Sequence, residues 1–151
     1  MIQPAIKDWA GNVLINPDPG RGQLSSIQLG LSSLHPSAQA VMIWPVDQPA
    51  VSEDLVRGLA QLFVQSQALI AYPKCGDQRG HPAIFHRSLF QEFMNEPLTQ
   101  GPREILVRHQ CETSMLEVQE TFAVKDIDTP ADYLELTGET LDSALKRFRF
   151  R

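Results

Sequence analysis

An unbroken apolar run over residues 40–44, followed by a turn with one carboxylate, constrains this chain more than any other stretch. Such a run predicts a strand buried on both faces, which is typical of parallel sheets covered by helices. Asp47 follows between Pro45 and Pro49, and neither proline suits a strand ladder or a helix interior, so we expect a fixed turn. Ser52 then caps a helix. This order places Asp47 at the carboxyl end of a strand, where open α/β sheets bind ligands. The alternative is a solvated turn residue.

Composition limits the kind of protein. The chain has 151 residues, 42% of them hydrophobic and 21% charged, which predicts one globular domain. The net charge of −5 argues against a general nucleic-acid surface, because phosphate backbones bind clustered Lys and Arg. No stretch reads as a signal peptide or reaches the length of a membrane span, so we expect a cytoplasmic protein without membrane contact.

Hydrophobic spacing predicts strands that alternate with helices along the chain. Helices are expected over residues 1–9, 23–34, 53–63, 87–94 and 102–110, and strands over residues 13–15, 40–44, 68–72, 83–85 and 115–118. Pro73 is expected to end the third strand, which forms a hairpin with the fourth across a long loop. The pattern predicts one α/β domain with a mostly parallel sheet over residues 1–138, and an amphipathic helical tail over residues 139–151.

Two helix starts carry candidate binding groups. Ser25 and Ser26 fall in the first turn after a loop rich in Gly and Pro, where an anion or a polar ring edge meets free amides. Ordinary helix capping is an equal alternative. Arg103 also lies in a first turn, which is unfavourable for a cation, and this indicates an external anionic partner.

Three further polar residues stand out by position. His81 is fixed between a glycine and a proline, and a structural role for it is the alternative to a functional one. In the stretch DIDTPADY, a capping box accounts for Asp132 and leaves Asp126 and Asp128 spare. Because these two alternate on an extended segment, we expect one to face inward and the other away.

Several motifs in order resemble one family. The stretches NPDPGRGQLSSIQLGL, VDQP, RGHPAIF, GPREIL and DIDTPADY resemble the molybdenum-cofactor nucleotidyltransferases, most closely the molybdopterin cytidylyltransferase branch. The resemblance runs from about Met1 to Leu136. It implies a Rossmann-like three-layer sandwich of the nucleotide-diphospho-sugar transferase type. It also implies Mg²⁺-dependent transfer of a nucleotidyl group, with CMP from CTP favoured, to a phosphate-bearing acceptor such as molybdopterin.

The resemblance also assigns residues. It implies catalytic roles for Asp47 and Asp128, metal binding by Asp47, Asp126 and Asp128, nucleotide binding by Gly22, Gln23, Ser25 and Ser26, and acceptor binding by Gly80, His81 and Arg103.

One departure from the family affects these expectations. The family begins with an apolar strand and a Gly-rich loop that cradles the triphosphate, and this sequence begins after them, so we expect weak or absent catalysis by this chain alone. The strand at residues 13–15 then lacks its neighbour, which predicts altered pairing, a dimer closed through the unpaired sheet edge, or a partner that supplies the missing piece. The alternative function is a non-catalytic assembly or nucleotide-binding module with the same fold.

Overall fold

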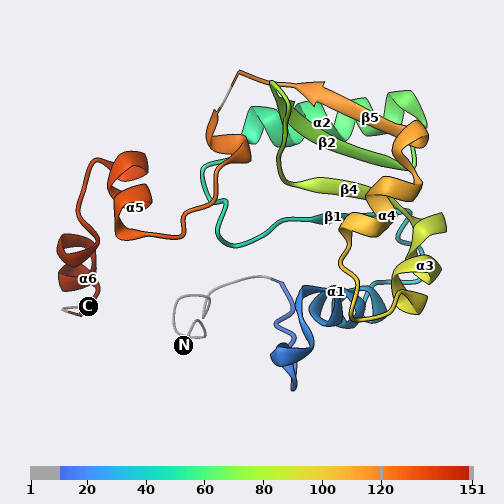
Figure 1. Cartoon of the computed structure of the whole chain (residues 1–151), viewed down its shortest axis with the longest axis horizontal. Helices are drawn as coiled ribbons and strands as arrows, with labels where there is room; N and C mark the ends of the chain where they lie inside the picture. The colour runs from blue at the N-terminus through green and yellow to red at the C-terminus, as the bar shows by residue number, and fades with distance from the viewer. Residues whose placement is uncertain (1–10, 120, 150–151) are drawn as a thin grey trace.

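The computed structural model describes residues 11–119 and 121–149. In this part of the chain, a five-stranded sheet lies between helices on both faces (Figure 1). The strands are β1 (Ala40–Ile43), β2 (Ile70–Cys75), β3 (Gln78–Arg79), β4 (Ala83–His86) and β5 (Thr113–Glu117). The helices are α1 (Gln23–Ser32), α2 (Glu53–Ser66), α3 (Phe90–Asn95), α4 (Arg103–Arg108), α5 (Pro130–Thr137) and α6 (Leu141–Arg149), with 3₁₀ turns η2 (Pro19–Arg21), η3 (Arg87–Leu89), η4 (Gln110–Glu112) and η5 (Thr121–Val124).

The three-layer α/β architecture is confirmed, but the expectation of a mostly parallel sheet is wrong. Among the described strands, β1 pairs with β4, β4 with β2, and β2 with β3, all antiparallel, and only β2 with β5 is parallel. The cause is the predicted hairpin between β2 and β4, which returns β4 between β1 and β2. Because β1 and β2 both oppose β4, the strands β1, β2 and β5 still run in one direction.

Strand β1 is not buried on both faces as its apolar sequence predicted. All four of its residues are half-buried, and among the described residues only β4 pairs with it. The apolar run predicted the strand correctly but not its place in the sheet, because an edge strand whose two faces are partly covered has the same composition as a central one.

Pro73 lies inside β2 rather than ending it. The last pair between β2 and β4 is Ala71 with Ile84, so the same register two residues on would set Pro73 opposite Pro82. Neither proline has an N–H to donate, and the Pro73 carbonyl accepts instead from the N–H of Gly80 at 2.8 Å. The proline is tolerated because the antiparallel ladder stops there while β2 continues beside β5.

The hydrophobic core divides between the two faces of the sheet. On one face, Leu24 and Leu31 of α1, Phe93 of α3 and Ile105 of α4 pack against Ile70, Tyr72, Ala83 and Phe85 of the sheet. On the other face, Leu59 of α2 packs against Ala71 and Ile84. The Phe85 and Phe93 rings meet edge to face with their centroids 5.0 Å apart, a favoured aromatic geometry.

Charged side chains join α3 to α4. Arg108 donates through Nε to Glu92 at 2.7 Å and also pairs with the buried Glu96. His109 contacts Glu92 through Nε2 at 2.7 Å and Glu112 through Nδ1 at 2.8 Å. The hydrogen bond with Glu112 and then the contact with Glu92 raise the pKa of His109, although partial burial opposes the shift.

The predicted strand at residues 13–15 is not present. This segment is irregular, and Val13, Leu14 and Ile15 expose 51%, 46% and 69% of their surfaces. The sequence has the composition of a strand, but a strand needs a paired neighbour, and none of the described strands supplies one. The helix predicted over residues 1–9 lies outside the described residues.

The chain leaves the sheet through η5 and ends in two helices, α5 and α6, that pack on each other beside the domain (Figure 1). Thr129 caps α5, and Thr129 and Asp132 form the predicted capping box. In α6, Ala144 is buried, whereas Leu145 is 48% exposed. Within the described residues, no helix has the length and apolar character that crossing a bilayer requires.

Candidate functional site

Three segments distant in sequence meet at one end of the sheet, where β1, β2 and β5 end and β4 begins (Figure 1). Ile43, the last residue of β1, pairs with Ala83, the first of β4. The turn after β1 and the segment before β4 therefore leave the sheet at the same point. The segment before α5 joins them, because the N–H of Ile127 donates to the carbonyl of Asp47 at 2.8 Å.

The turn that carries Asp47 is fixed from within, as its flanking prolines predicted. The N–H of Gln48 donates to the carbonyl of Pro45 at 3.3 Å, and the indole Nε1 of Trp44 donates to the carbonyl of Gln48 at 2.8 Å. Ser52 caps α2 as predicted, accepting from the N–H of Leu55 at 3.2 Å. The side chain of Gln48 is 4% exposed and donates through Nε2 to Oδ1 of Asp126 at 2.5 Å.

Unsatisfied buried polar atoms concentrate at this junction. In the described part of the chain, the buried side-chain atoms without a hydrogen-bond partner are Oδ1 of Asp47, Oε1 of Gln48 and Nδ1 of His81. Each such atom costs about 1–3 kcal/mol of stability. Buried polar groups are otherwise almost always paired, so three at one place indicate groups held for a ligand.

His81 lies close enough to both acidic segments for their charges to act on it. Burial lowers the pKa of His81, and the negative charges of Asp126 and Asp47 oppose the shift without reversing it. The ring is therefore neutral at pH 7. The charges of Asp47 and Asp126 thus reach His81, which the family resemblance assigned to the acceptor side of the site.

The donor atoms at the junction suit a hard divalent cation. Asp47, Asp126 and Gln48 offer oxygen atoms, the ligand type that Mg²⁺ and Mn²⁺ prefer. Among the described residues, no group of three or more His, Cys, Asp or Glu side chains is arranged to hold a metal ion. Mg²⁺ is usually held by one or two carboxylates together with substrate phosphates. The residues therefore fit a cation that arrives with a phosphate ligand.

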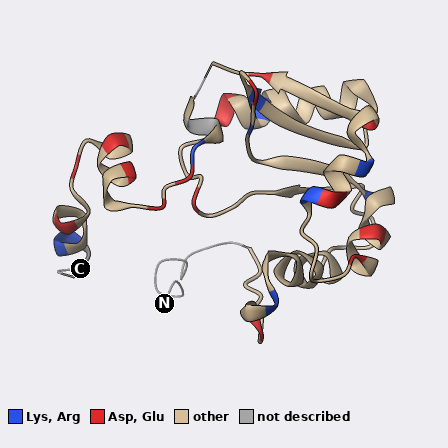
Figure 2. Cartoon of the chain, viewed as in Figure 1, with Lys and Arg blue, Asp and Glu red and all other residues tan. Residues whose placement is uncertain are grey.

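Asp126 and Asp128 are both exposed, and they differ in their contacts. Asp126 bonds to Gln48, whereas within the described residues the Asp128 carboxylate makes no hydrogen bond or ion pair. Figure 2 shows acidic residues, in red, along the connection from η5 to α5. The neighbouring cation, Lys125, pairs with Glu135 at 2.5 Å. Lys125 is therefore held by α5.

The residues expected to bind the nucleotide lie around the start of α1. Gly22 precedes the helix with φ +86°, a conformation that glycine adopts without strain. The side chain of Asn16 donates to Oγ of Ser25 at 2.8 Å and to Oγ of Ser26 at 2.9 Å. Ser25 in turn donates to the carbonyl of Gly22 at 2.7 Å. The two hydroxyls therefore fix the loop before α1, and neither caps the helix.

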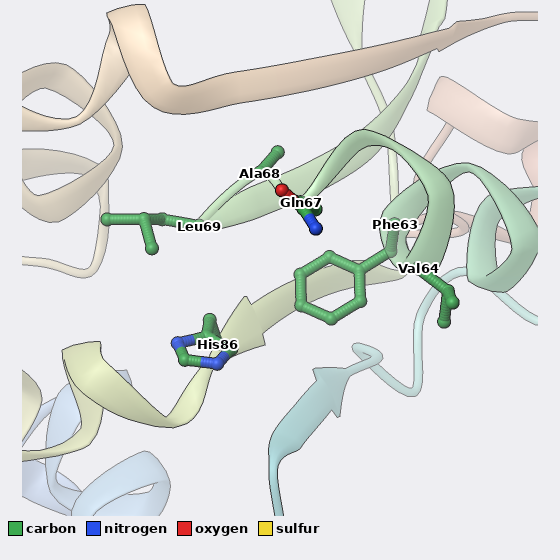
Figure 3. A pocket seen from close by; sticks show the side chains of 6 residues that line it. All are labelled: Phe63, Val64, Gln67, Ala68, Leu69 and His86. Atoms are coloured by element: carbon green, nitrogen blue, oxygen red, sulfur yellow. The ribbon is translucent and has the colours of Figure 1, made fainter.

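A shallow apolar groove of about 240 Å³ lies between α1 and β1. Its lining residues are Gln23, Ser26, Ile27, Gly30, Leu31, Val41 and Ile43. A second pocket of about 240 Å³ lies where α2 ends and β2 begins, and in Figure 3 the rings of Phe63 and His86 flank it. This second pocket shares no lining residue with the acidic junction.

The other two residues expected to bind the acceptor, Gly80 and Arg103, lie in different parts of the fold. Gly80 is buried next to His81 and donates to Pro73, as described above. Arg103 is exposed on α4, and no hydrogen bond or ion pair joins it to the junction within the described chain. Sequence reasoning gave no role to Gln48 or Asn16. The position of Gln48, directly after Asp47 in a turn bounded by prolines, was the available signal.

Comparison with known proteins places the chain in a family. Residues 2–113 match the MobA-like NTP transferase domain, whereas the curated proteins gave no match. The fold is similar to the crystal structure of Rv0371c from Mycobacterium tuberculosis H37Rv, with 23% identity and a TM-score of 0.73 over 91% of this chain and 72% of that chain. It is also similar to a complex of that protein with manganese, with 24% identity and a TM-score of 0.64 over 76% of this chain and 60% of that one.

A third related structure is molybdopterin-guanine dinucleotide biosynthesis protein A from Archaeoglobus fulgidus. It shares 18% identity and a TM-score of 0.64 over 90% of this chain and 71% of that chain. The aligned region spans about 60% of the length of the manganese-bound relative. At these identities the similarity establishes the fold, and the sequence match over residues 2–113 establishes that the chain belongs to the family of MobA-like NTP transferase domains.

Proposed function

We propose that the junction of Asp47, Gln48, His81 and Asp126 is the cation and phosphate site of a nucleotidyltransferase domain. The observation that carries this proposal is the set of three buried polar atoms without partners, all at the ends of strands in a nucleotidyltransferase-type fold. In the proposed reaction, an oxygen of the acceptor phosphate forms a bond to the α-phosphorus of a nucleoside triphosphate. The bond from that phosphorus to the β-phosphate oxygen breaks, and pyrophosphate leaves.

The side chains have distinct roles in this proposal. Asp47 and Asp126 hold the divalent cation, Mg²⁺ in the first instance, and Asp128, whose carboxylate has no bonding partner within the described residues, takes part as a further acidic group of the site. A bound cation neutralises charge on the phosphates. His81 stays neutral because of its burial, so it offers a hydrogen bond to the ligand without competing with the cation for the carboxylates.

The ligands are proposed by class. Gln23 and Ser26 line the groove beside β1, where the base of the nucleotide, CTP by preference, would lie, and Gly22 and Ser25 adjoin them in the sequence. Gly80 and Arg103 would contact a phosphate-bearing acceptor such as molybdopterin. Molybdopterin-guanine dinucleotide biosynthesis protein A is among the similar structures, which supports this acceptor class. We propose the cytoplasm as the location of this chemistry.

Isothermal titration of CTP and GTP with Mg²⁺ tests the proposal, with Asp47→Ala as the comparison. We expect saturable, Mg²⁺-dependent binding by the wild-type chain that the variant loses. Preference for GTP would change the proposed nucleotide donor and leave the proposed cation site at Asp47 in place. Equal titration curves for the two chains would refute a cation site at Asp47.

The second candidate is an assembly module, and the edge of β1 favours it. The backbone N–H of Arg87 donates to the carbonyl of Gln39 at 2.8 Å. In an antiparallel pair the backbone groups of every second residue bond to the neighbouring strand, so those of Ala40 point away from β4. An open edge of this kind pairs readily with another chain. Light scattering after size exclusion tests it: a dimer that Ala40→Pro converts to monomer supports assembly through β1, and a wild-type monomer at all concentrations excludes self-assembly there.

A further inference from the structure

Gln48 joins the two acidic segments of the junction through its side chain. It is 78 residues from Asp126 in the sequence, and its Nε2 donates to Oδ1 of that carboxylate at 2.5 Å. Its backbone is held at both ends of the turn, by Pro45 on one side and the Trp44 indole on the other. The turn after β1 is therefore fixed, and it holds the segment of Asp126 through this amide and through the backbone bond from Ile127 to Asp47.

The orientation of the amide is chemically informative. A carboxylate only accepts hydrogen bonds when ionised, so the amide must turn its N–H group to Asp126. That choice leaves Oε1 of Gln48 buried and without a partner among the described residues. An oxygen held in this way is a ligand atom for a cation or an acceptor for a donor on the substrate.

We propose that Gln48 is a positioning residue, which holds Asp126 beside Asp47 for a divalent cation and leaves its own Oε1 to the ligand. This inference rests on the proposed function. Replacing the amide by an apolar group of similar length frees Asp126 to turn into solvent, because Asp126 itself is exposed. The two carboxylates then no longer meet the cation in a fixed arrangement.

The test is Mn²⁺ binding by the whole chain, measured by electron paramagnetic resonance of the free ion. Gln48→Met removes the amide and keeps the length of the side chain. Gln61→Met makes the same change at an exposed position of α2 and serves as the control. We expect Gln48→Met to weaken Mn²⁺ binding about 10–100-fold, the usual effect of removing a group that orients a metal ligand. Gln61→Met should bind as the wild type does.

Thermal unfolding in EDTA separates positioning from a structural role. We expect the melting temperature of Gln48→Met to stay within about 2 °C of the wild type, since the variant loses one hydrogen bond but also removes a buried oxygen without a partner. A lower melting temperature with unchanged Mn²⁺ affinity would show that the bond is structural and overturn the proposal.

Asp47→Ala distinguishes this inference from the proposed function. If Asp47→Ala weakens Mn²⁺ binding and Gln48→Met does not, the cation site stands and the role of Gln48 is refuted. If the wild-type chain binds Mn²⁺ no more tightly than Asp47→Ala, the cation site fails and the role of Gln48 fails with it.

Discussion

Neutralising Asp47 should stabilise the ligand-free chain, the opposite of what most substitutions at buried positions do. Oδ1 of Asp47 is buried without a partner, and the Asp126 carboxylate is close enough for both negative charges to act on the same histidine. Asp47→Asn keeps the shape of the side chain, removes its negative charge and adds N–H donors. An unpaired buried group costs about 1–3 kcal/mol, so we expect a gain of about 1–2 kcal/mol in the free energy of unfolding. For a chain of this size, that gain is about 3–6 °C in Tm.

The assay is urea unfolding in EDTA, repeated with Mn²⁺ and CTP. A ligand at a hundred times its Kd adds about 2.7 kcal/mol to a chain that binds it, so the wild type should overtake Asp47→Asn when both are present. Asp77→Asn, in the exposed turn before β3, is the control and should change stability by less than about 0.5 kcal/mol. If Asp47→Asn is less stable than the wild type in EDTA, then Asp47 is a structural turn residue, and the argument from unsatisfied atoms is wrong.

Two predictions concern the charged groups between α3 and α4. Arg108→Met leaves the Glu96 carboxylate, which is 6% exposed, without its cation. We expect it to lower the free energy of unfolding in urea by about 2–3 kcal/mol. This loss is below the range for fully buried ion pairs because the arginine is 42% exposed. Arg103→Met on the same helix is the control. An equal loss of unfolding free energy in that variant would contradict the assignment of the effect to the ion pair between Arg108 and Glu96. The bond to Glu112 raises the pKa of His109, so its stabilisation is complete below the unfolded value of about 6.5 and is lost as pH rises through the folded pKa. The stability difference between wild type and His109→Gln should therefore shrink from pH 6 to pH 9, and a constant difference would contradict this linkage.

The sequence predicted which segments form helices and strands better than it predicted which strands pair with one another. Periodicity located α1, α2 and β4, because each carries its own cap or its own apolar pattern. It failed at residues 13–15, where the apolar composition of a strand is present but no described strand pairs with it. A strand depends on a partner that local sequence cannot name, whereas a helix satisfies its backbone within itself.

For the candidate site, too, the sequence singled out individual residues but not their contacts. Turn chemistry singled out Asp47, and the late acidic motif singled out Asp126 and Asp128, and their roles stay predictions. Spacing did not indicate which of them turns toward Asp47, since that depends on the bond from Gln48 across 78 residues. His81 was chosen for its flanking glycine and proline, and the pairing of Ile43 with Ala83 brings its segment to the same end of the sheet as the turn that carries Asp47.

Prolines explain why polar side chains gather at this end of the sheet. Pro82 follows directly on His81 and comes just before the first paired residue of β4, where the register with β1 stops at Ala83, and the register with β2 stops at Ile84. A residue without an N–H cannot extend either ladder, so the chain on each side is free to turn. Pro45 has the same effect at the end of β1, two residues before Asp47. The features that end the sheet thus also set Asp47 and His81 just beyond it, where each has a buried side-chain atom without a partner among the described residues.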